Sequence, residues 1–205
     1  MPEQVTLRPV REDDLPLLRT LTQDPQVTGE FEQYGWYAPR LFQRSWEDNG
    51  LISADGGNLM VVCGDDVLGA VNWRRHDTAP ASHCWALGIG LFPRARGRGY
   101  GTQAHRLLVD YLFAHTTVHR IEAATETGNI AEQKALERAG FSREGVLRGI
   151  RWRGARGGTR CSTASCAPIA PADSPGGPVE PAGDHAGSRS WTSSCSARVP
   201  SPTQQ

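Results

Sequence analysis

The segment LFPRARGRGYGT at residues 91–102 constrains this chain most, because it joins a β-rich run to a helical stretch through three glycines and three arginines. Glycines let the backbone turn tightly and bring several N–H groups toward one anion, and the positive end of the following helix adds attraction. Arg94, Arg96 and Arg98 either place mobile charge around that anion or lie in solvent as surface arginines. The segment therefore predicts a pyrophosphate-binding loop at residues 96–102.

Two other phosphate-binding loops do not match this segment. A Walker loop places Gly-Lys-Ser/Thr after its glycines, and the segment has no lysine. A Rossmann fingerprint lies on the first turn between a strand and a helix, whereas several predicted strands come first in this chain. Neither a Walker-type nor a Rossmann-type nucleotide site is therefore indicated.

Hydrophobic periodicity predicts one α/β domain. Strands are expected at residues 5–10, 58–63, 67–74, 83–92, 120–125 and 146–152. Helices are expected from residue 11 onward, at 39–48, at 99–115, and at 130–139, where Gly140 ends the last one. The aromatic residues of one connecting segment form either core or a wall of an acceptor site, and they are Phe31, Tyr34, Trp36 and Tyr37. This order of elements indicates a sheet with helical crossovers.

The chain changes character near residue 154. Its 205 residues leave room for one domain of ordinary size and a tail. We place the domain at residues 5–153. From residue 154 to 205, Ser, Pro, Ala, Gly and Thr dominate and the periodicity disappears, which is typical of disordered sequence.

The motif RGRGYG at residues 96–101 resembles the R/Q-x-x-G-x-G/A signature of the GNAT acetyltransferases. The strand at 83–92 resembles the splayed fourth strand of that family, and Asn129 with ALERAGF at residues 135–141 resembles its N-x-x-S-x-x-x-x-E-K-x-G-F segment. A second register of the signature starts at Arg94, but the Arg96 register places Gly101 and Thr102 at the helix start. The resemblance covers residues 5–153 and is nearest to the branch that includes the ribosomal-protein alanine acetyltransferases.

This resemblance implies the GNAT fold, with a mixed, mostly antiparallel sheet and helices on both faces. It implies an acetyl-CoA-dependent N-acyltransferase that acts on a primary amine of a protein N-terminus or a small molecule. Strand residues would pair with the pantetheine arm, loop amides would hold the pyrophosphate, and Asn129 would contact the arm or the acetyl end while also suiting a helix N-cap. The acetyl-CoA-binding residues implied are Ile89, Gly90, Leu91, Arg96, Gly97, Arg98, Gly99, Tyr100, Gly101, Thr102 and Asn129.

The positions where relatives carry catalytic groups are filled differently here. Ala86 and Ala124 occupy the places of the family's basic glutamates, and Leu136 occupies the place of the tyrosine that protonates the leaving thiolate. Catalysis would then depend on positioning, on a backbone amide near Ile89 and on water.

Other side chains are candidates for the missing base. Period two puts Glu122 and Glu126 on the same strand face as Ala124, so Glu126 is the preferred base and Glu122 the second candidate. His76 and His83 are further candidates, although a lone histidine is more often structural.

Composition limits the partners and the compartment. The formal net charge of +0 offers no basis for binding nucleic acid or an acidic membrane, and no apolar run is long enough for a membrane helix. The N-terminus lacks a signal-peptide pattern, so we expect a cytoplasmic protein. Cys63 and Cys84 lie in apolar stretches and no CxxC pair occurs, so neither a disulfide nor a metal is expected. The oligomeric state is not indicated.

Two other functions stay open at this stage. A catalytically impaired CoA-binding protein would explain Ala86, Ala124 and Leu136. A nucleic-acid binder using the arginine cluster has little support, because one short basic loop on an uncharged chain offers a small electrostatic footprint.

The C-terminal tail has a further explanation. The family expects another strand after residues 146–152, but residues 156–167 read RGGTRCSTASCA and show no strand pattern. Read from the third base of Arg156, the same nucleotides can encode WRDEVLYSVLR, which has the pattern of a strand. We hypothesise that a one-nucleotide shift near residues 154–156 replaced the final strand; an ordinary low-complexity tail is the alternative.

Overall fold

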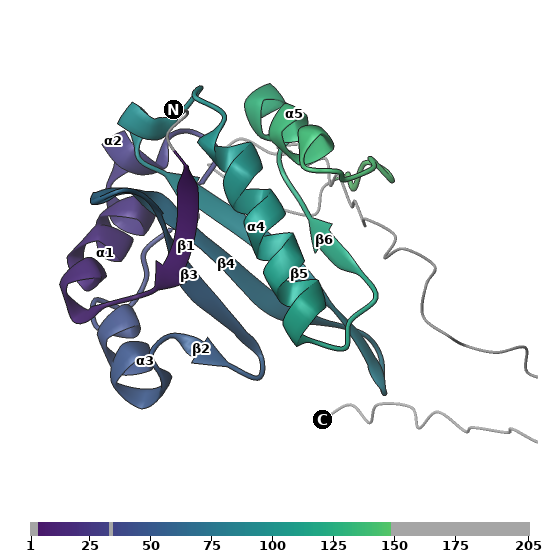
Figure 1. Cartoon of the computed structure of the whole chain (residues 1–205), viewed down its shortest axis with the longest axis horizontal. Coiled ribbons are helices and arrows are strands. Elements are labelled where there is room, and N and C mark those ends of the chain that lie inside the picture. The colour runs from purple at the N-terminus through teal and green to yellow at the C-terminus, as the bar shows by residue number, and fades with distance from the viewer. Residues whose placement is uncertain (1–3, 33–34, 149–205) are drawn as a thin grey trace, which may run out of the picture. The chain divides into compact units, whose positions relative to one another are not determined.

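The computed structural model describes residues 4–32 and 35–148, whose helices and strands are shown in Figure 1. The strands are β1 (Val5–Pro9), β2 (Ile52–Ser53), β3 (Gly56–Cys63), β4 (Asp66–Ala79), β5 (Ser82–Leu91) and β6 (Ile121–Ala123). The helices are α1 (Leu15–Gln23), α2 (Pro25–Thr28), α3 (Leu41–Asn49), α4 (Tyr100–His115) and α5 (Ile130–Arg138), with the short 3-10 helices η1 (Glu12–Asp14) and η2 (Pro93–Ala95). None of these helices combines the length and the apolar character needed to cross a membrane.

One sheet joins the strands in the order β1-β3-β4-β5-β6, and β2 pairs with β3. The pairs β1–β3, β3–β4 and β4–β5 are antiparallel, whereas β5 and β6 are parallel. A parallel pair needs a long crossover, and α4 supplies it. The predicted mixed, mostly antiparallel α/β sheet is confirmed.

Helices cover both faces of this sheet because successive strand residues point to opposite sides. In β3, Met60 belongs to a buried cluster with Leu18 of α1, while Val61 belongs to a second cluster with Leu108 of α4. Figure 1 shows α4 crossing the sheet. Burying an apolar side chain of this size contributes about 1.5–3 kcal/mol of transfer free energy. The expected arrangement of helices on both faces is therefore confirmed.

Several predicted elements keep their place with shifted ends. The strand expected at 120–125 is confined to Ile121–Ala123, and β4 continues to Ala79, beyond residue 74. Asn129 caps α5, since its side-chain oxygen accepts a hydrogen bond from the Glu132 N–H at 3.2 Å. Gly140 has a φ of 101°, the left-handed conformation expected just after a helix.

The strand predicted at residues 146–152 is wrong for the part that the structure describes. Residues 146–148 have no strand conformation, and Val146 and Leu147 are 40% and 46% exposed. A strand without a neighbour leaves its N–H and C=O groups unpaired, and among the described residues the sheet ends at β6. Residues 149–152, the tail at 154–205 and the frameshift hypothesis lie outside the described residues.

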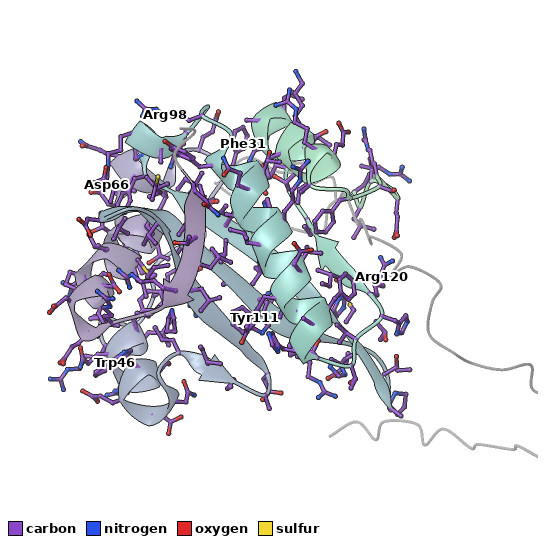
Figure 2. The ribbon with its side chains drawn as sticks, in the orientation of Figure 1. Phe31, Trp46, Asp66, Arg98, Tyr111 and Arg120 are labelled. Atoms are coloured by element: carbon purple, nitrogen blue, oxygen red, sulfur yellow. The ribbon has the colours of Figure 1, made fainter. Side chains whose placement is uncertain are left out.

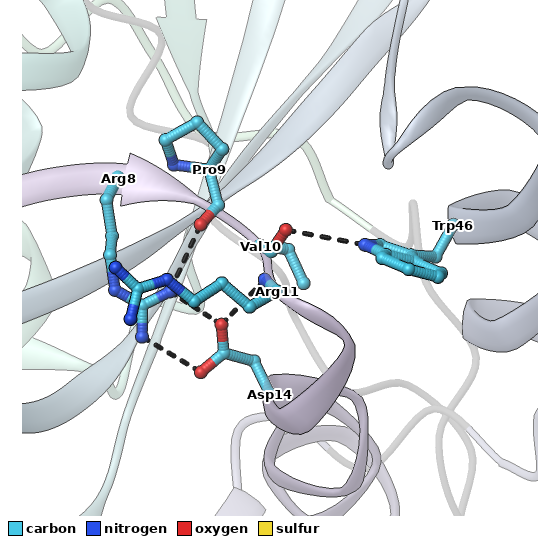
Figure 3. Close-up of polar contacts among 6 residues, drawn as sticks. All are labelled: Arg8, Pro9, Val10, Arg11, Asp14 and Trp46. Carbon is cyan, nitrogen blue, oxygen red and sulfur yellow. Dashed lines mark hydrogen bonds and ion pairs between the residues drawn. The ribbon is translucent and has the colours of Figure 1, made fainter.

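An ion pair fixes β1 to the start of the first helical segment, as Figure 3 shows. Arg8 donates two hydrogen bonds to the Asp14 carboxylate, at 2.6 and 2.9 Å, and the Arg11 N–H donates a third at 2.8 Å. The hydrogen bonds from Arg8 outweigh burial and hold the pKa of Asp14 below its usual value, with help from Arg11. Trp46 of α3 joins the same corner, because its indole N–H donates to the Val10 carbonyl at 3.4 Å.

Replacing Asp14 tests how much this corner stabilises the fold. Asp14→Ala should lower the free energy of unfolding by about 2–3 kcal/mol at pH 7, because it leaves the half-buried Arg8 side chain without its carboxylate partner. The native carboxyl has the lower pKa, so its contribution is present above the unfolded value of about 4 and is lost as the pH falls below it. Urea titrations at pH 7 and pH 3 measure the difference. Asp13→Ala removes an exposed neighbouring carboxylate as a control, and equal losses from both variants would contradict the prediction.

Candidate functional site

Strands β5 and β6 separate partway along their length. β5 pairs with β4 up to Leu91, but it pairs with β6 only over residues 85–87. Beyond this point, among the described residues, no strand pairs with the second edge of β5 at residues 88–91. An open strand edge presents N–H and C=O groups to which an extended ligand can pair. Ile89, Gly90 and Leu91 lie in this stretch, and their binding role stays a prediction.

The predicted phosphate loop leads from the end of β5 to the start of α4. Gly97 and Gly99 have φ values of 73° and 81°, and a Cβ atom on either would meet nothing within 4 Å. Gly99 is the N-cap of α4, and its carbonyl accepts a hydrogen bond from Gln103 at 3.2 Å. Gly101 and Thr102 come before Gln103 in the first turn, so by helix geometry their N–H groups have no carbonyl partner within the helix and point out of its end. The structure thus brings the loop glycines, a helix N-terminus and the open strand edge together.

The three arginines of this loop take different positions. Arg96 donates a hydrogen bond to the Leu91 carbonyl at 2.9 Å and another to the Val27 carbonyl, so its side chain ties the loop to α2. Arg94 donates to a backbone carbonyl of β4 at 2.6 Å. Arg98 is exposed, and Figure 2 labels it at this end of the domain. The backbone contacts of Arg96 indicate that it shapes the loop, while phosphate contact by any of the three stays a prediction.

A cleft of about 660 Å³ lies at the point where β5 and β6 separate. It is lined by α1, by the loop after α2 and by the first turn of α5. Its apolar wall is formed by Leu18, Leu21, Phe31, Tyr37 and Phe42. Its polar groups come mainly from Asn58, Asn72, Arg74, Glu32, Glu126, Asn129 and Glu132. An apolar wall with a few convergent polar groups is typical of a small-ligand site.

The aromatic residues that were expected to form either core or an acceptor wall lie in different surroundings. Phe31 and Tyr37 line the cleft, as an acceptor wall requires. Phe31 also lies over the turn after β6, because a Cβ atom on Gly128 would be 3.4 Å from its ring. Trp36 is 90% exposed and belongs to neither the core nor the cleft lining, and Tyr34 lies outside the described residues.

The turn after β6 places Glu126 and Asn129 in the cleft. The Asn129 N–H donates to the Glu126 carbonyl at 2.9 Å, and Gln133 reaches back to the same carbonyl at 3.2 Å. Glu126 is only 6% exposed. The preferred candidate for the base and the asparagine of the family segment therefore lie in one site, and their chemical roles stay predictions.

Glu122 lies in β6 itself and away from the cleft. It is absent from the cleft lining, contacts Nδ1 of His76 and lies 3.7 Å from the Arg120 guanidinium. Arg120, labelled in Figure 2, is itself paired with Glu144 at 2.7 Å. Leu136 is buried in the core against α4 and does not line the cleft.

His76, Cys84 and Glu122 are the described residues that could hold a metal ion. They come from three adjacent strands, and their potential ligand atoms lie within 4.8 Å of one another. Two observations oppose this role, since His76 is paired with Glu122 and Arg120 lies beside the same carboxylate. Burial, and then the charge of Glu122, raise the pKa of the Cys84 thiol, which disfavours the thiolate that a metal binds. The absence of a metal stays a prediction.

Glu32 is a candidate that sequence reasoning missed. It belongs to the loop after α2, lines the cleft, and lies so near β5 that a Cβ atom on Gly90 would be 3.7 Å from its Oε2 atom. Burial, and then the charge of Glu132, raise the pKa of Glu32 to about 7, although Arg96 acts in the opposite direction. The sequence has no signal that distinguishes it from Glu30, an exposed glutamate of the same loop.

Comparison with known proteins identifies the family to which this domain belongs. The acetyltransferase (GNAT) domain family matches residues 4–142. The chain therefore belongs to the GNAT acetyltransferase family, a class of acetyl-CoA-dependent N-acyltransferases.

Individual relatives are more distant. Probable N-acetyltransferase YjcK of Bacillus subtilis is 42% identical over 62 residues, so the match spans 30% of this chain and 34% of YjcK. The structure of Mycobacterium smegmatis RimJ in complex with CoA-disulfide has a TM-score of 0.61 and 22% identity, covering 78% of this chain and 80% of RimJ. Spermidine N-acetyltransferase from Vibrio cholerae in complex with CoA and spermine has a TM-score of 0.63 and 18% identity, covering 79% of this chain and 94% of that enzyme. At such identities the two structures show a shared fold.

The raised pKa of Glu32 predicts a pH-dependent effect of Glu32→Gln on stability. The native carboxyl titrates at about 7 and the unfolded one at about 4.3, so the native state binds more protons and loses stability as pH rises between these values. Glutamine removes this cost, which is at most about 4 kcal/mol above pH 7. The variant should therefore melt at a higher temperature than the parent at pH 8 and at the same temperature at pH 4.

Glu137→Gln is the matched control, because it changes an exposed glutamate of α5 and should leave the melting temperature unchanged at both values of pH. A Glu32→Gln variant that melts below the parent at pH 8 would show that the carboxylate stabilises the native state, which contradicts the raised pKa.

Proposed function

We propose that this protein transfers an acetyl group from acetyl-CoA to a primary amine, carried by a protein N-terminus or a small molecule. One observation carries the proposal: the open edge of β5 at residues 88–91 leads to the N-terminus of α4. A donor with an extended arm and a pyrophosphate at one end fits that arrangement, because the strand edge pairs with the arm and the helix end attracts the phosphates.

The donor would be held mainly by backbone groups. Residues 89–91 would pair with the pantetheine arm, and the amides of residues 97–102 would hold the pyrophosphate. The open space above Gly97 and Gly99 leaves room for phosphate oxygens. Asn129 lines the cleft and would contact the arm or the acetyl end.

The acceptor would enter the cleft as a cation. Three glutamates line it, whereas Arg74 is the only basic residue among the described residues of its lining, so the local field favours an ammonium over an anion. The apolar wall would hold the rest of the acceptor. Transfer requires that the ammonium lose a proton, that its nitrogen attack the thioester, and that the thiolate leave. Glu126 is the base that the sequence favours, and it lies in this cleft.

The comparisons support the donor and the class of acceptor. RimJ was solved with CoA-disulfide, and the Vibrio cholerae enzyme with CoA and spermine, a polyamine. A protein N-terminus is the acceptor that would follow from membership of the ribosomal-protein acetyltransferase branch, and a polyamine is the alternative.

The loop offers the sharpest test of this proposal. Gly101→Asp should weaken acetyl-CoA binding by about 5- to 1000-fold, because like charges about 4 Å apart near a protein surface repel by about 1–4 kcal/mol. The fold should persist, since a Cβ atom on Gly101 would lie 3.6 and 3.9 Å from Leu91 and Ile89, and an acidic residue suits the first turn of a helix. Calorimetric titration with acetyl-CoA measures binding, and circular dichroism measures the fold.

Gly101→Asn is the matched control, because it adds nearly the same volume without the charge and should keep most of the affinity. Arg98→Ala should cost about 1 kcal/mol, since water replaces part of an exposed charge-assisted contact. If Gly101→Asp bound acetyl-CoA like the parent with an unchanged circular dichroism spectrum, the pyrophosphate would not lie on this loop and the proposal would fail.

A further inference from the structure

Glu32 approaches the open edge of β5 from the side of α1. A Cβ atom on Gly90 would lie 3.7 Å from the Glu32 carboxylate and 4.0 Å from Leu21 of α1. The neighbouring residues Ile89 and Leu91 point the other way and pack against the cluster that contains α4. A donor bound at α4 and an acceptor entering past α1 would therefore meet at this edge, with Glu32 on the acceptor's side.

Gly90 has no side chain on the face of β5 that Glu32 approaches. A Cβ atom there would make ordinary van der Waals contact with the carboxylate, at 3.7 Å from its Oε2 atom. Leu21 of α1 lies on the same side of the strand. Glu32 is therefore near the backbone on which the donor arm would lie, and it is half-buried.

Charged groups from several elements surround Glu32. Glu132 of α5 disfavours a negative charge on it, and Arg96 of the phosphate loop favours one. Glu126 and Arg74 line the same cleft. Glu132 is itself held in place, because Nε2 of the buried His105 lies 2.8 Å from its carboxylate. The net effect raises the pKa of Glu32 to about 7, near the value at which a carboxylate both accepts and releases protons efficiently at neutral pH.

We infer that Glu32 is the general base of this protein and accepts the proton that the acceptor ammonium must lose before its nitrogen attacks the acetyl carbonyl. The inference rests on the proposed acetyl transfer. It also assigns Glu132 as a positioning residue, which acts through Glu32 and is fixed by His105.

The step balances in atoms and charge. One proton passes from R–NH₃⁺ to the Glu32 carboxylate, and the freed lone pair forms the N–C bond. The C–S bond breaks with its electrons on sulfur, and a second proton from the nitrogen ends on the thiolate. Glu32 then returns its proton to water, so an ammonium and acetyl-CoA give an amide, CoA thiol and one proton.

The pH dependence of kcat/KM tests this assignment. The probes are acetyl-CoA with a peptide that has a free N-terminal alanine, and acetyl-CoA with spermidine. In the full-length parent, kcat/KM should rise with pH through about 7, as Glu32 loses its proton. Glu32→Gln should lower kcat/KM at pH 7.5 by about 10²- to 10⁴-fold, and its remaining pH dependence should follow the amine. Acetyl-CoA binding should be unchanged.

Two further variants separate a base from a structural role. Glu132→Gln should keep the limb of the pH profile but move it to lower pH, because one of the two causes of the raised pKa is gone. Glu137→Gln, which changes an exposed glutamate outside the cleft lining, should leave the profile as it is. Glu126→Gln competes directly with the inference: loss of the limb in this variant and its persistence in Glu32→Gln would overturn the assignment in favour of Glu126.

A second readout needs no acceptor. Carbon-13 NMR of the glutamate carboxyls, with the Glu32 signal assigned from Glu32→Gln, should give a titration near pH 7 that moves down in Glu132→Gln. A titration below pH 5 in the parent would overturn the inference by itself. If the parent bound acetyl-CoA but acetylated neither probe nor any other amine, the proposed function would fail, and this titration would still decide the state of Glu32.

Discussion

The unequal pairing on the two sides of β5 is the constraint on which the rest of the site depends. On one side, β5 pairs with β4 as far as Leu91, the last residue of β5, and this pairing makes the strand rigid. On the other side, its pairing with β6 ends at residue 87. Because the first side is complete, the open part of the second side stays extended and does not collapse. The cleft, the loop after the strand and the start of α4 all follow from this one separation.

The two ends of the site have opposite electrostatic character. The loop end has the N-terminus of a 16-residue helix and three arginines, one of which is fixed to backbone carbonyls. The cleft end has three glutamates. Under the proposed function, a donor that carries phosphates and an acceptor that carries an ammonium would be attracted to different ends, and this division would orient both substrates before any chemistry occurs.

The proposed base lies on a loop, although the family usually places it on a strand. Ala86 and Ala124 have no proton to exchange, but a loop that reaches over the sheet can bring a carboxylate to the same edge. Glu32 makes that approach over Gly90, and its burial supplies the raised pKa that a strand glutamate would need from its own surroundings. Glu132 of α5 contributes to the raised pKa through its charge, and His105 of α4 holds Glu132 in place.

The sequence by itself determined the features that depend on local spacing. The α/β order, the glycine loop before α4, the Asn129 cap and the Gly140 terminus are all set by residues within a few positions of one another. Only the tertiary structure decided which glutamates line the cleft. Glu122 and Glu126 share a predicted strand face, yet the short β6 leaves one with His76 and turns the other into the cleft. Glu32 lies far from both in sequence, and no local pattern marks it, because its pKa comes from burial and from a glutamate 100 positions away.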